Sequence, residues 1–275
     1  MNKLISALFT AILVLLLASC GGNDPLGPET DAAKLASVPN TGMGLLVKHT
    51  GTNCYYCGKW GWKTMEQAIE IADEKMLIIA AYGNHGFGEF FMTDFASQLD
   101  NQYGIDAFPT FTANGIRVWP NQSSDDSLGF SMVEQALEIY QNHMDSSLDV
   151  GAALNWSVAN NVATINARFK FLKDCDGEYY GTVWFDESGM QAYQDGYEGE
   201  EDPYHKRVLR TATGGSVFGE LFADGKIETN HMVEKSWNID FPENEWKKEN
   251  VRATLVIFKK VKDKYKFVNA SWAVF

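Results

Sequence analysis

Apolar residues in the first part of the chain follow two different spacings. Residues 43–50 contain a short apolar run and residues 76–82 form another, as buried strands often do. Between these two strands, apolar residues recur every three or four positions, which predicts a helix with one buried face. The residues on that face are Met65, Ala68, Ile69, Ala72 and Met76. We therefore expect the order strand, helix, strand.

The pattern continues with a short helix, a hairpin and a longer helix. Residues 95–102 favour a helix, and residues 108–112 and 116–119 favour two strands. Asn114-Gly115 lies between these strands and is a strong signal for a tight hairpin turn. The capping-box pattern at residues 131–134 predicts that the last helix opens there.

Beyond about residue 146 the spacing changes to strict alternation. Residues 163–171 place five apolar side chains on one face and polar ones on the other, which predicts a half-buried strand. Further strands are predicted at residues 154–158, 179–186, 207–212, 229–237, 253–261 and 265–274, the last two joined by a turn at Asp263-Lys264. About seven strands without long helices indicate an antiparallel β-sandwich of the Ig-like kind.

The N-terminus has a pattern of its own, in which Lys3 precedes an apolar run from Leu4 to Ala18. A membrane span needs about 20 apolar residues, so this shorter run favours a secretory signal peptide. Its end, Leu-Ala-Ser-Cys at residues 17–20, resembles a bacterial lipobox, which implies cleavage after residue 19 and lipidation of Cys20. The alternative is an ordinary cleaved signal followed by a chance cysteine.

These patterns divide the chain into four segments. Residues 1–19 are the predicted signal peptide, and residues 20–40, rich in glycine and proline, are a predicted flexible tether. Residues 41–146 are predicted to form an α/β domain, and residues 147–275 an all-β domain. We expect a lipid chain on Cys20 to anchor both domains to a membrane without spanning it.

Charge narrows the choice of partners. The 275 residues include 23 Lys and Arg against 36 Asp and Glu, a net charge of −13. Neutralising phosphates requires a basic face, so we expect no nucleic-acid partner. Export would place the protein where disulfides form and persist.

Cys54 and Cys57 form a C-x-x-C motif between the first strand and the first helix. Such a motif is either half of a zinc site or a redox dithiol. Zinc needs further ligands at regular spacing, which the five histidines do not supply, so no metal and no cofactor is predicted. At a helix N-terminus the unpaired N–H groups favour the thiolate, the attacking species in disulfide exchange. Cys175 is left over, in a predicted turn whose flanking acids should raise its pKa.

The order strand, C-x-x-C, helix, strand, followed by a helix, Phe108-Pro109-Thr110, a hairpin and a last helix, resembles the thioredoxin superfamily. The resemblance implies that Cys54 is an exposed nucleophile and that Cys57 resolves the mixed disulfide. It also implies that Pro109 is cis and lies beside the dithiol, so that Phe108, Pro109 and Thr110 bind substrate together with Tyr55 and Tyr56.

Two departures from that family stand out. Asn53 precedes the first cysteine, and Tyr55-Tyr56 separates the two cysteines, where thioredoxins usually have Trp and Gly-Pro. Lys48 occupies the position of the usual buried acid, six residues before Cys54. This lysine either lowers the pKa of Cys54 or is a solvated residue at the end of a strand.

A second resemblance covers most of residues 44–275. The segment from His49 to Cys57, together with Tyr204–Arg210, Trp246 and the closing strands, resembles the Omp28-related outer membrane lipoprotein family. In that family a thioredoxin-like domain is followed by a β-rich domain. The resemblance implies a lipoprotein in the envelope of a Gram-negative bacterium, with the periplasmic or surface face left open.

Two functions remain open at this point. One is a thiol-disulfide oxidoreductase or isomerase that acts on exported proteins, or exchanges electrons with a membrane redox partner, through Cys54 and Cys57. The other is a non-enzymatic binding or adhesion lipoprotein, in which the thioredoxin-like domain is a scaffold and the disulfide is structural. Exposure of Cys54 discriminates between them.

Overall fold

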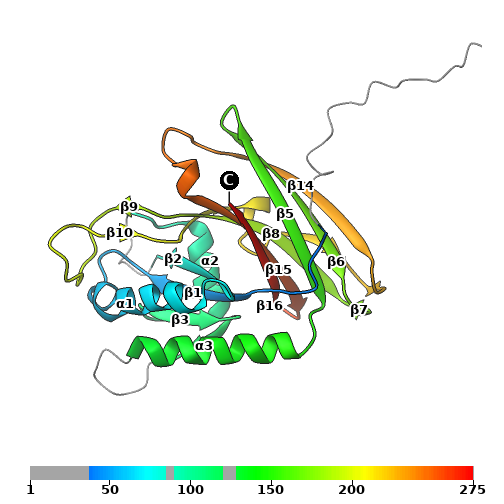
Figure 1. Cartoon of the computed structure of the whole chain (residues 1–275), viewed down its shortest axis with the longest axis horizontal. Coiled ribbons are helices and arrows are strands. Elements are labelled where there is room, and N and C mark those ends of the chain that lie inside the picture. Colours follow the sequence, from blue (N-terminus) through cyan, green and yellow to red (C-terminus); the bar gives the residue numbers. More distant parts are fainter. Residues whose placement is uncertain (1–36, 85–89, 120–127, 275) are drawn as a thin grey trace, which may run out of the picture. The chain divides into compact units, whose positions relative to one another are not determined.

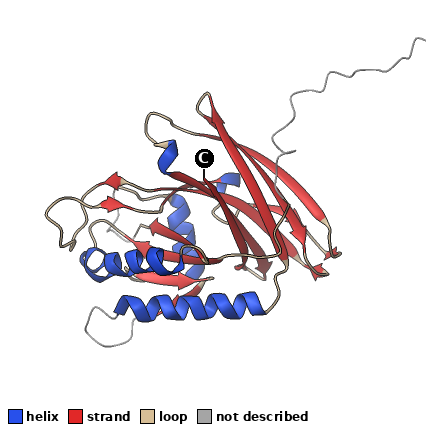
Figure 2. Ribbon diagram, viewed as in Figure 1, coloured by secondary structure: helices blue, strands red, loops and turns tan. Residues whose placement is uncertain are grey.

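The computed structural model describes residues 37–84, 90–119 and 128–274, all within one compact unit, Asp31–Phe275. The protein is mostly β, with 44% of its residues in strands, few helices and a mixed sheet (Figures 1 and 2). The predicted signal peptide, Cys20 and the tether up to residue 36 lie outside the described residues. No helix within the described ranges is long and apolar enough to cross a membrane.

The first half of the chain alternates strands and helices as the pattern predicts. The elements are β1 (Gly44–Thr50), α1 (Tyr55–Ala72), β2 (Met76–Tyr82), α2 (Asp94–Tyr103), β3 (Thr110–Ala113), β4 (Ile116–Val118) and α3 (Leu128–Asp145). The strands pair in the order β2-β1-β3-β4, in which β1 and β2 are parallel and β3 is antiparallel to both its neighbours. Every residue of β1 and β2 is buried, which explains their continuous apolar runs.

Two helices cover one face of these four strands. α1 and α3 pack side by side, and their apolar faces form a core with Leu46, Ile78 and Phe111 of the sheet (Figure 1). α3 begins at Leu128, so the capping-box pattern lies inside the helix, and the prediction that the helix opens at Ser131 is wrong. The predicted hairpin turn is confirmed, because Asn114 and Gly115 adopt φ values of 49° and 82°, as a two-residue turn of this kind requires.

The second half consists of strands and two short 3₁₀ turns in its described part. The strands are β5 (Val150–Ala159), β6 (Val162–Phe171), β7 (Cys175–Asp176), β8 (Glu178–Glu187), β9 (Met190–Gln191), β10 (Tyr204–His205), β11 (Val208–Ala212), β12 (Glu220–Ala223), β13 (Lys226–Ile227), β14 (Met232–Asp240), β15 (Val251–Val261) and β16 (Lys264–Val274). The 3₁₀ turns are η2 (Thr213–Gly215) and η3 (Lys248–Asn250).

Two layers of these strands enclose an apolar core. One layer is the three-stranded sheet β14-β6-β5, and the other contains β8, β15 and β16. The alternation predicted for residues 163–171 is confirmed, since the five apolar side chains of that face are completely buried in this core. The last hairpin turns one residue earlier than predicted, because Val261 pairs with Lys264 and the turn is Lys262-Asp263.

A single sheet runs through both halves of the chain. It follows the order β16-β15-β8-β11-β2-β1-β3-β4, and the halves join where the Ala80 N–H of β2 donates to the Arg207 carbonyl just before β11, at 2.8 Å. A further core packs Leu45 and Val47 of β1 against Trp184 and Phe258 of the second half. The predicted boundary between residues 146 and 147 falls between α3 and β5, while the sheet and this core are shared across it.

Candidate functional site

The C-x-x-C motif lies at the junction between β1 and α1. Cys54 is the N-cap of α1 in an extended conformation, and its Sγ accepts the Cys57 N–H at 3.3 Å. The two cysteines are joined by a disulfide. Cys57 is completely buried and Cys54 is only 5% exposed. The implied exposure of Cys54 is therefore wrong for this conformation of the chain.

The loop between β9 and β10, residues 192–203, belongs to the second half of the chain and packs against the backbone around the disulfide. The Gln194 Nε2 group lies 3.2–3.3 Å from four carbonyl oxygens, that of the neighbouring Asp195 and those of Gly51, Thr52 and Cys54. An amide has two hydrogens, so these contacts share them and hold the side chain in one place. Gln194 thus fastens the β9–β10 loop to the residues that lead into α1.

Backbone contacts also hold the β9–β10 loop against the residues that lead into α1. The Asp195 N–H donates to the Thr52 carbonyl at 2.8 Å. A Cβ on Gly58 would overlap the Asp195 carbonyl oxygen, so only glycine allows the loop to approach α1 this closely. Gly196 has a φ of 76°, and a Cβ at this position would overlap the Tyr55 carbonyl oxygen. These contacts explain why Cys54 is inaccessible.

Lys48 is buried behind the motif and is not a solvated strand-end residue. Its Nζ donates to the Cys57 carbonyl at 3.3 Å and lies 5.5 Å from the centre of the Trp62 ring. Burial lowers the pKa of Lys48 to about 7, because desolvation penalises the charged ammonium more than the nearby Glu66 favours it. Lys48 is therefore close to its titration point at neutral pH.

His205, which follows the β9–β10 loop in the sequence, bonds back to the first residue of that loop. Its Nδ1 lies 2.6 Å from the Tyr82 hydroxyl and its Nε2 lies 3.1 Å from the Ala192 carbonyl. The carbonyl can only accept, so Nε2 carries the proton and Nδ1 accepts from Tyr82. Burial lowers the pKa of His205 to about 4, which keeps the ring neutral in this arrangement.

The residues expected to bind substrate are divided between buried and exposed positions. Pro109 is cis, as the resemblance implies, and is buried against α1, where a Cβ on Gly61 would come within 2.9 Å of its ring. Phe108 is half-buried, and the Thr110 hydroxyl donates to the Ala107 carbonyl at 2.7 Å. Their roles in binding substrate stay predictions.

Tyr55 and Tyr56, between the two cysteines, have exposed side chains. They are 49% and 60% exposed, and their rings meet edge to face at 5.4 Å. Tyr193 and Tyr204 on the β9–β10 segment are also exposed, at 50% and 57%. Tyr193 precedes Gln194 in the β9–β10 loop, whereas Tyr204 lies near Ile69 in the later turns of α1, away from the motif.

Cys175 is a free cysteine within β7 rather than in a turn. Partial burial is the main cause that raises the pKa of its thiol, and the charge of Asp149 adds to it. The predicted direction is confirmed, although the cause is chiefly desolvation. Across the described residues, no group of three or more His, Cys, Asp and Glu side chains is arranged to hold a metal ion.

Taken together, these features define a β-rich protein with one disulfide covered by its own chain. Residues 96–270 match the family of outer membrane protein Omp28, and the chain belongs to that family. The matched range includes the β9–β10 loop, whereas the C-x-x-C motif lies before it. The predicted Omp28 membership is therefore confirmed.

A solved structure shares the fold. HBP35 of Porphyromonas gingivalis superposes with a TM-score of 0.66 at 12% sequence identity, covering 87% of this chain and 77% of its own. At that identity the likeness shows the fold alone. No curated protein sequence matches the chain.

Proposed function

We propose that this protein is a non-enzymatic binding lipoprotein of the outer membrane. Its first half serves as a thioredoxin-like scaffold, and the Cys54–Cys57 disulfide braces that scaffold. One observation carries the proposal: Cys54 is 5% exposed beneath the β9–β10 loop. An attacking thiolate must reach a disulfide sulfur directly, so a covered sulfur does not exchange.

Two further features support the proposal. The strand order β2-β1-β3-β4, with the C-x-x-C after β1, is what a thioredoxin-like scaffold requires. The exposed tyrosines of the motif, Tyr55 and Tyr56, offer aromatic surface for a protein partner, since tyrosine is enriched in interfaces. In this proposal a lipid on Cys20 anchors the folded unit to the membrane. The acidic net charge of the chain argues against a nucleic-acid partner.

Turnover of a protein disulfide tests the proposal. The wild-type chain and the Gln194→Ala variant are compared in the reduction of insulin by dithiothreitol. The proposal expects both proteins to stay at the uncatalysed rate, because a structural disulfide gains no activity when the loop loosens. Gln191→Ala is the matched control, since Gln191 lies on the same hairpin and its side-chain bond within the described residues goes to the Asp202 carbonyl, at 3.2 Å, and not to the residues around the disulfide. Catalysed turnover by the wild-type chain would contradict the proposal.

A second candidate function is latent thiol-disulfide exchange that begins when the β9–β10 loop opens. The observation that favours it is the buried amine of Lys48, which donates to the Cys57 carbonyl. Burial lowers the pKa of this amine to about 7. In the reduced protein the Cys54 thiolate would attack a partner disulfide, forming a mixed disulfide and releasing one partner thiolate. Cys57, after giving its proton to Lys48, would attack Cys54 Sγ and release the second partner thiolate, so that two electrons pass to the partner.

Two results separate this candidate from the first. Latent exchange requires Gln194→Ala to gain insulin reduction while Gln191→Ala does not. In the Gln194→Ala background, Cys57→Ser should trap a mixed disulfide on Cys54 that mass spectrometry detects. If the loosened variant neither gains activity nor traps a partner, latent exchange is wrong and the scaffold proposal stands.

A further inference from the structure

The strand β14 forms a long open edge of the three-stranded sheet β14-β6-β5, and Figure 1 shows it in orange along the rim of that sheet. It pairs with β6 through nine consecutive residues without a bulge, and no described strand pairs with its other side. Proteins usually protect such an edge with a proline, a bulge or a short strand. β14 has nine residues and contains no proline. Its open side is therefore suited to pairing with another strand.

The backbone of β14 directs every second residue to this open side. Just before the strand, the Phe171 N–H of β6 donates to the His231 carbonyl at 2.9 Å. Just after it, the Phe241 N–H donates to the Asn161 carbonyl at 2.8 Å. The odd-numbered positions therefore bond to β6, and in an antiparallel ladder the positions between them face the other way. Within the described part of the chain, no hydrogen bond involves the outward backbone groups of these residues, which are Met232, Glu234, Ser236, Asn238 and Asp240.

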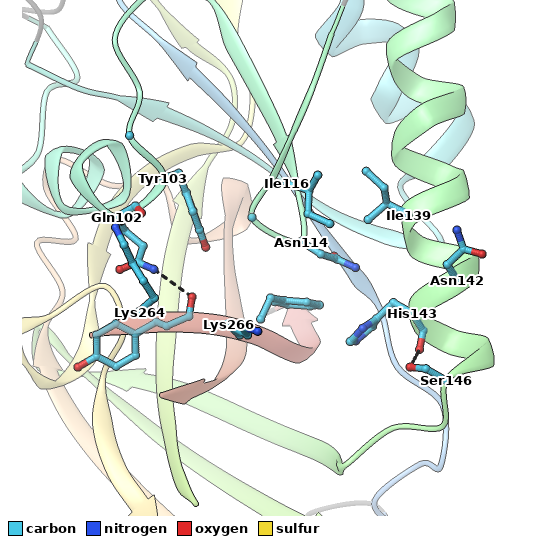
Figure 3. Close-up of a pocket in the computed structure, with 14 residues that line it drawn as sticks. Gln102, Tyr103, Asn114, Ile116, Ile139, Asn142, His143, Ser146, Lys264 and Lys266 are labelled. Atoms are coloured by element: carbon cyan, nitrogen blue, oxygen red, sulfur yellow. Dashed lines mark hydrogen bonds between the residues drawn. The ribbon is translucent and has the colours of Figure 1, made fainter. Parts of the chain in front are cut away.

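The other sheet edges are either covered or short. β16 ends the large sheet, and its Tyr265 carbonyl accepts from the Gln102 side chain of α2 at 3.1 Å. Its Val268 carbonyl accepts from His143 of α3 at 2.7 Å. Figure 3 shows both side chains at a cavity of about 880 Å³ lined by four segments, the end of α2, the turn between β3 and β4, the last turns of α3 and the start of β16. β5 packs against β16, while β4 and β12 have only three and four residues. β14 is thus the long edge that the chain leaves open.

The two faces of β14 differ in polarity. The side chains of the residues with outward backbone groups are exposed on the outer face of the sheet. On the inner face, Val233, Trp237 and Ile239 contact the core of the sandwich. Lys235 is the charged residue of that face, and its Nζ lies 3.9 Å from the Glu220 carboxylate of β12. A strand that pairs with β14 must match this order of exposed, apolar and charged positions.

A second copy of β14 provides that match in one antiparallel register. Alignment of the two copies about Ser236 pairs the whole strand with no like charges directly opposite. The opposed pairs are Met232–Asp240, Val233–Ile239, Glu234–Asn238 and Lys235–Trp237. The second pair is apolar, and the fourth brings an ammonium beside an aromatic ring, so both are favourable. Alignment about Lys235 would instead bring two lysines together, and alignment about Trp237 would oppose Glu234 to Asp240. Like charges directly opposite destabilise a sheet, so charge selects the register about Ser236.

We propose that β14 pairs with β14 of a second copy of this chain, antiparallel and aligned about Ser236. A two-fold axis then relates the copies, and one continuous sheet runs across the dimer in the order β5-β6-β14-β14-β6-β5. The occupant of the edge is a second copy, because the strand is complementary to itself in length, polarity and charge. The inference goes beyond the proposed function, and it is independent of whether the disulfide is inert or active, because the motif contributes nothing to this edge.

The test uses the full chain carrying Cys20→Ser, which removes the predicted lipid attachment point. Sedimentation equilibrium should show monomers and dimers with a dissociation constant on the order of 10 µM, because one strand edge is smaller than a standard interface. Amide exchange followed by NMR locates the contact. The N–H groups of Glu234, Ser236 and Asn238 should become protected as the protein concentration rises. The Val233 N–H bonds to β6 and should be protected at every concentration.

Two substitutions at Asn238 form a matched pair that tests the register. Both replace the amide that accepts from the Thr164 hydroxyl at 2.9 Å, and they differ in charge. In the proposed register residue 238 lies opposite Glu234 of the other copy, and this contact occurs twice in the dimer. We expect Asn238→Lys to tighten the dimer and Asn238→Glu to weaken it, each by roughly 2- to 30-fold.

The same pair of charges at Ser157 is the control. Ser157 is exposed on β5 opposite Thr164, so it lies in the same row of the sheet, two strands from the edge. At that separation, about 14 Å from the facing Glu234, salt screens the interaction. Ser157→Lys and Ser157→Glu should therefore leave the dissociation constant within about 2-fold of the wild-type value.

Three results would overturn the proposal. A chain that stays monomeric at all attainable concentrations would exclude the second copy and leave the edge to an extended segment of another protein. Exchange at Glu234, Ser236 and Asn238 that does not change with concentration would place any dimer contact elsewhere. Equal effects of Asn238→Lys and Asn238→Glu on the dissociation constant would exclude the register about Ser236.

Discussion

Gly58 and His205 show how single residues decide whether the disulfide is reachable. Gly58 lies in the first turn of α1, where the absence of a side chain lets the Asp195 carbonyl approach the helix. His205 is neutral and buried, and it holds the first residue of the β9–β10 loop through the Ala192 carbonyl. Both residues act by positioning the loop, although neither touches a sulfur in the contacts described above.

Replacing Gly58 with alanine should loosen the β9–β10 loop without harming α1. Alanine is the better helix former by about 1 kcal/mol, so any opening must come from the clash with Asp195. We expect the Asp195 amide, which donates to Thr52, to exchange its hydrogen roughly 10-fold faster than in the wild-type chain. Unchanged exchange at Asp195 would mean that the loop does not depend on this close approach.

The buried histidine predicts how stability depends on pH. The native state keeps His205 neutral down to about pH 4, whereas the unfolded chain binds a proton below its ordinary pKa of 6.5. Between these values the unfolded state binds more protons, so the free energy of unfolding should rise with pH across this window, by roughly 1–3 kcal/mol. The penalty is fully present below pH 4 and absent above pH 6.5.

Urea unfolding between pH 4 and 7 measures this dependence. His205→Gln keeps a donor and an acceptor but cannot titrate, so its curve should be flatter than that of the wild-type chain. His231→Gln, at an exposed position, is the control and should follow the wild-type curve. Equal slopes for all three proteins would contradict the assignment to His205.

A cluster of charged residues, with a buried Arg252–Asp186 pair and a partly exposed Arg207–Asp73 pair, joins the strands of the two halves. Arg252 on β15 bonds to Asp186 on β8 at 2.9 Å and donates to the Ile78 carbonyl of β2 at 3.1 Å. Arg207, before β11, reaches Asp73 at the end of α1 at 2.7 Å. These contacts lie where the sheet continues from β2 of the first half to β11 of the second, so they help to hold these strands in register.

Breaking this cluster should be far more costly than breaking a surface pair. Arg252→Ala leaves Asp186 buried without its main partner, which we expect to lower the free energy of unfolding by about 3–5 kcal/mol. Glu234→Ala removes the partner of Arg168 on the exposed face of β6 and β14, and should cost about 0–1 kcal/mol. Denaturant titration measures the free energy of unfolding of both variants. Similar decreases for Arg252→Ala and Glu234→Ala would show that the cluster does not hold the two halves together.

For the whole molecule, the shared sheet and shared core predict that the two halves unfold together. Leu45 and Val47 of β1 pack on Trp184 and Phe258, so neither half buries its apolar surface alone. We expect fluorescence and circular dichroism to report one coincident transition in urea. Two separated transitions would instead support independent domains over residues 41–146 and 147–275.

The sequence allowed much of the fold to be predicted, because periodicity reports which face of an element is buried. The buried runs at β1 and β2, the alternation in β6 and the Asn114-Gly115 turn all carry such local signals. No such local signal in the sequence predicts that the β9–β10 loop packs over the disulfide. Gln194 bonds to carbonyls about 140 residues away, and its surroundings resemble an ordinary polar loop. The same holds for the cavity, whose four lining segments meet only in the folded chain.

The chain itself shields the Cys54–Cys57 disulfide from solvent, and the rate at which a thiol reduces that disulfide measures the shielding. The native protein and the urea-unfolded protein are treated with the same dilute dithiothreitol, quenched with maleimide and mapped by mass spectrometry. We expect reduction in the native state to be slower by roughly 100-fold or more, because the sulfur becomes accessible only when the β9–β10 loop opens. Reduction of the native protein at the rate of the unfolded chain would mean that the folded chain does not shield the disulfide.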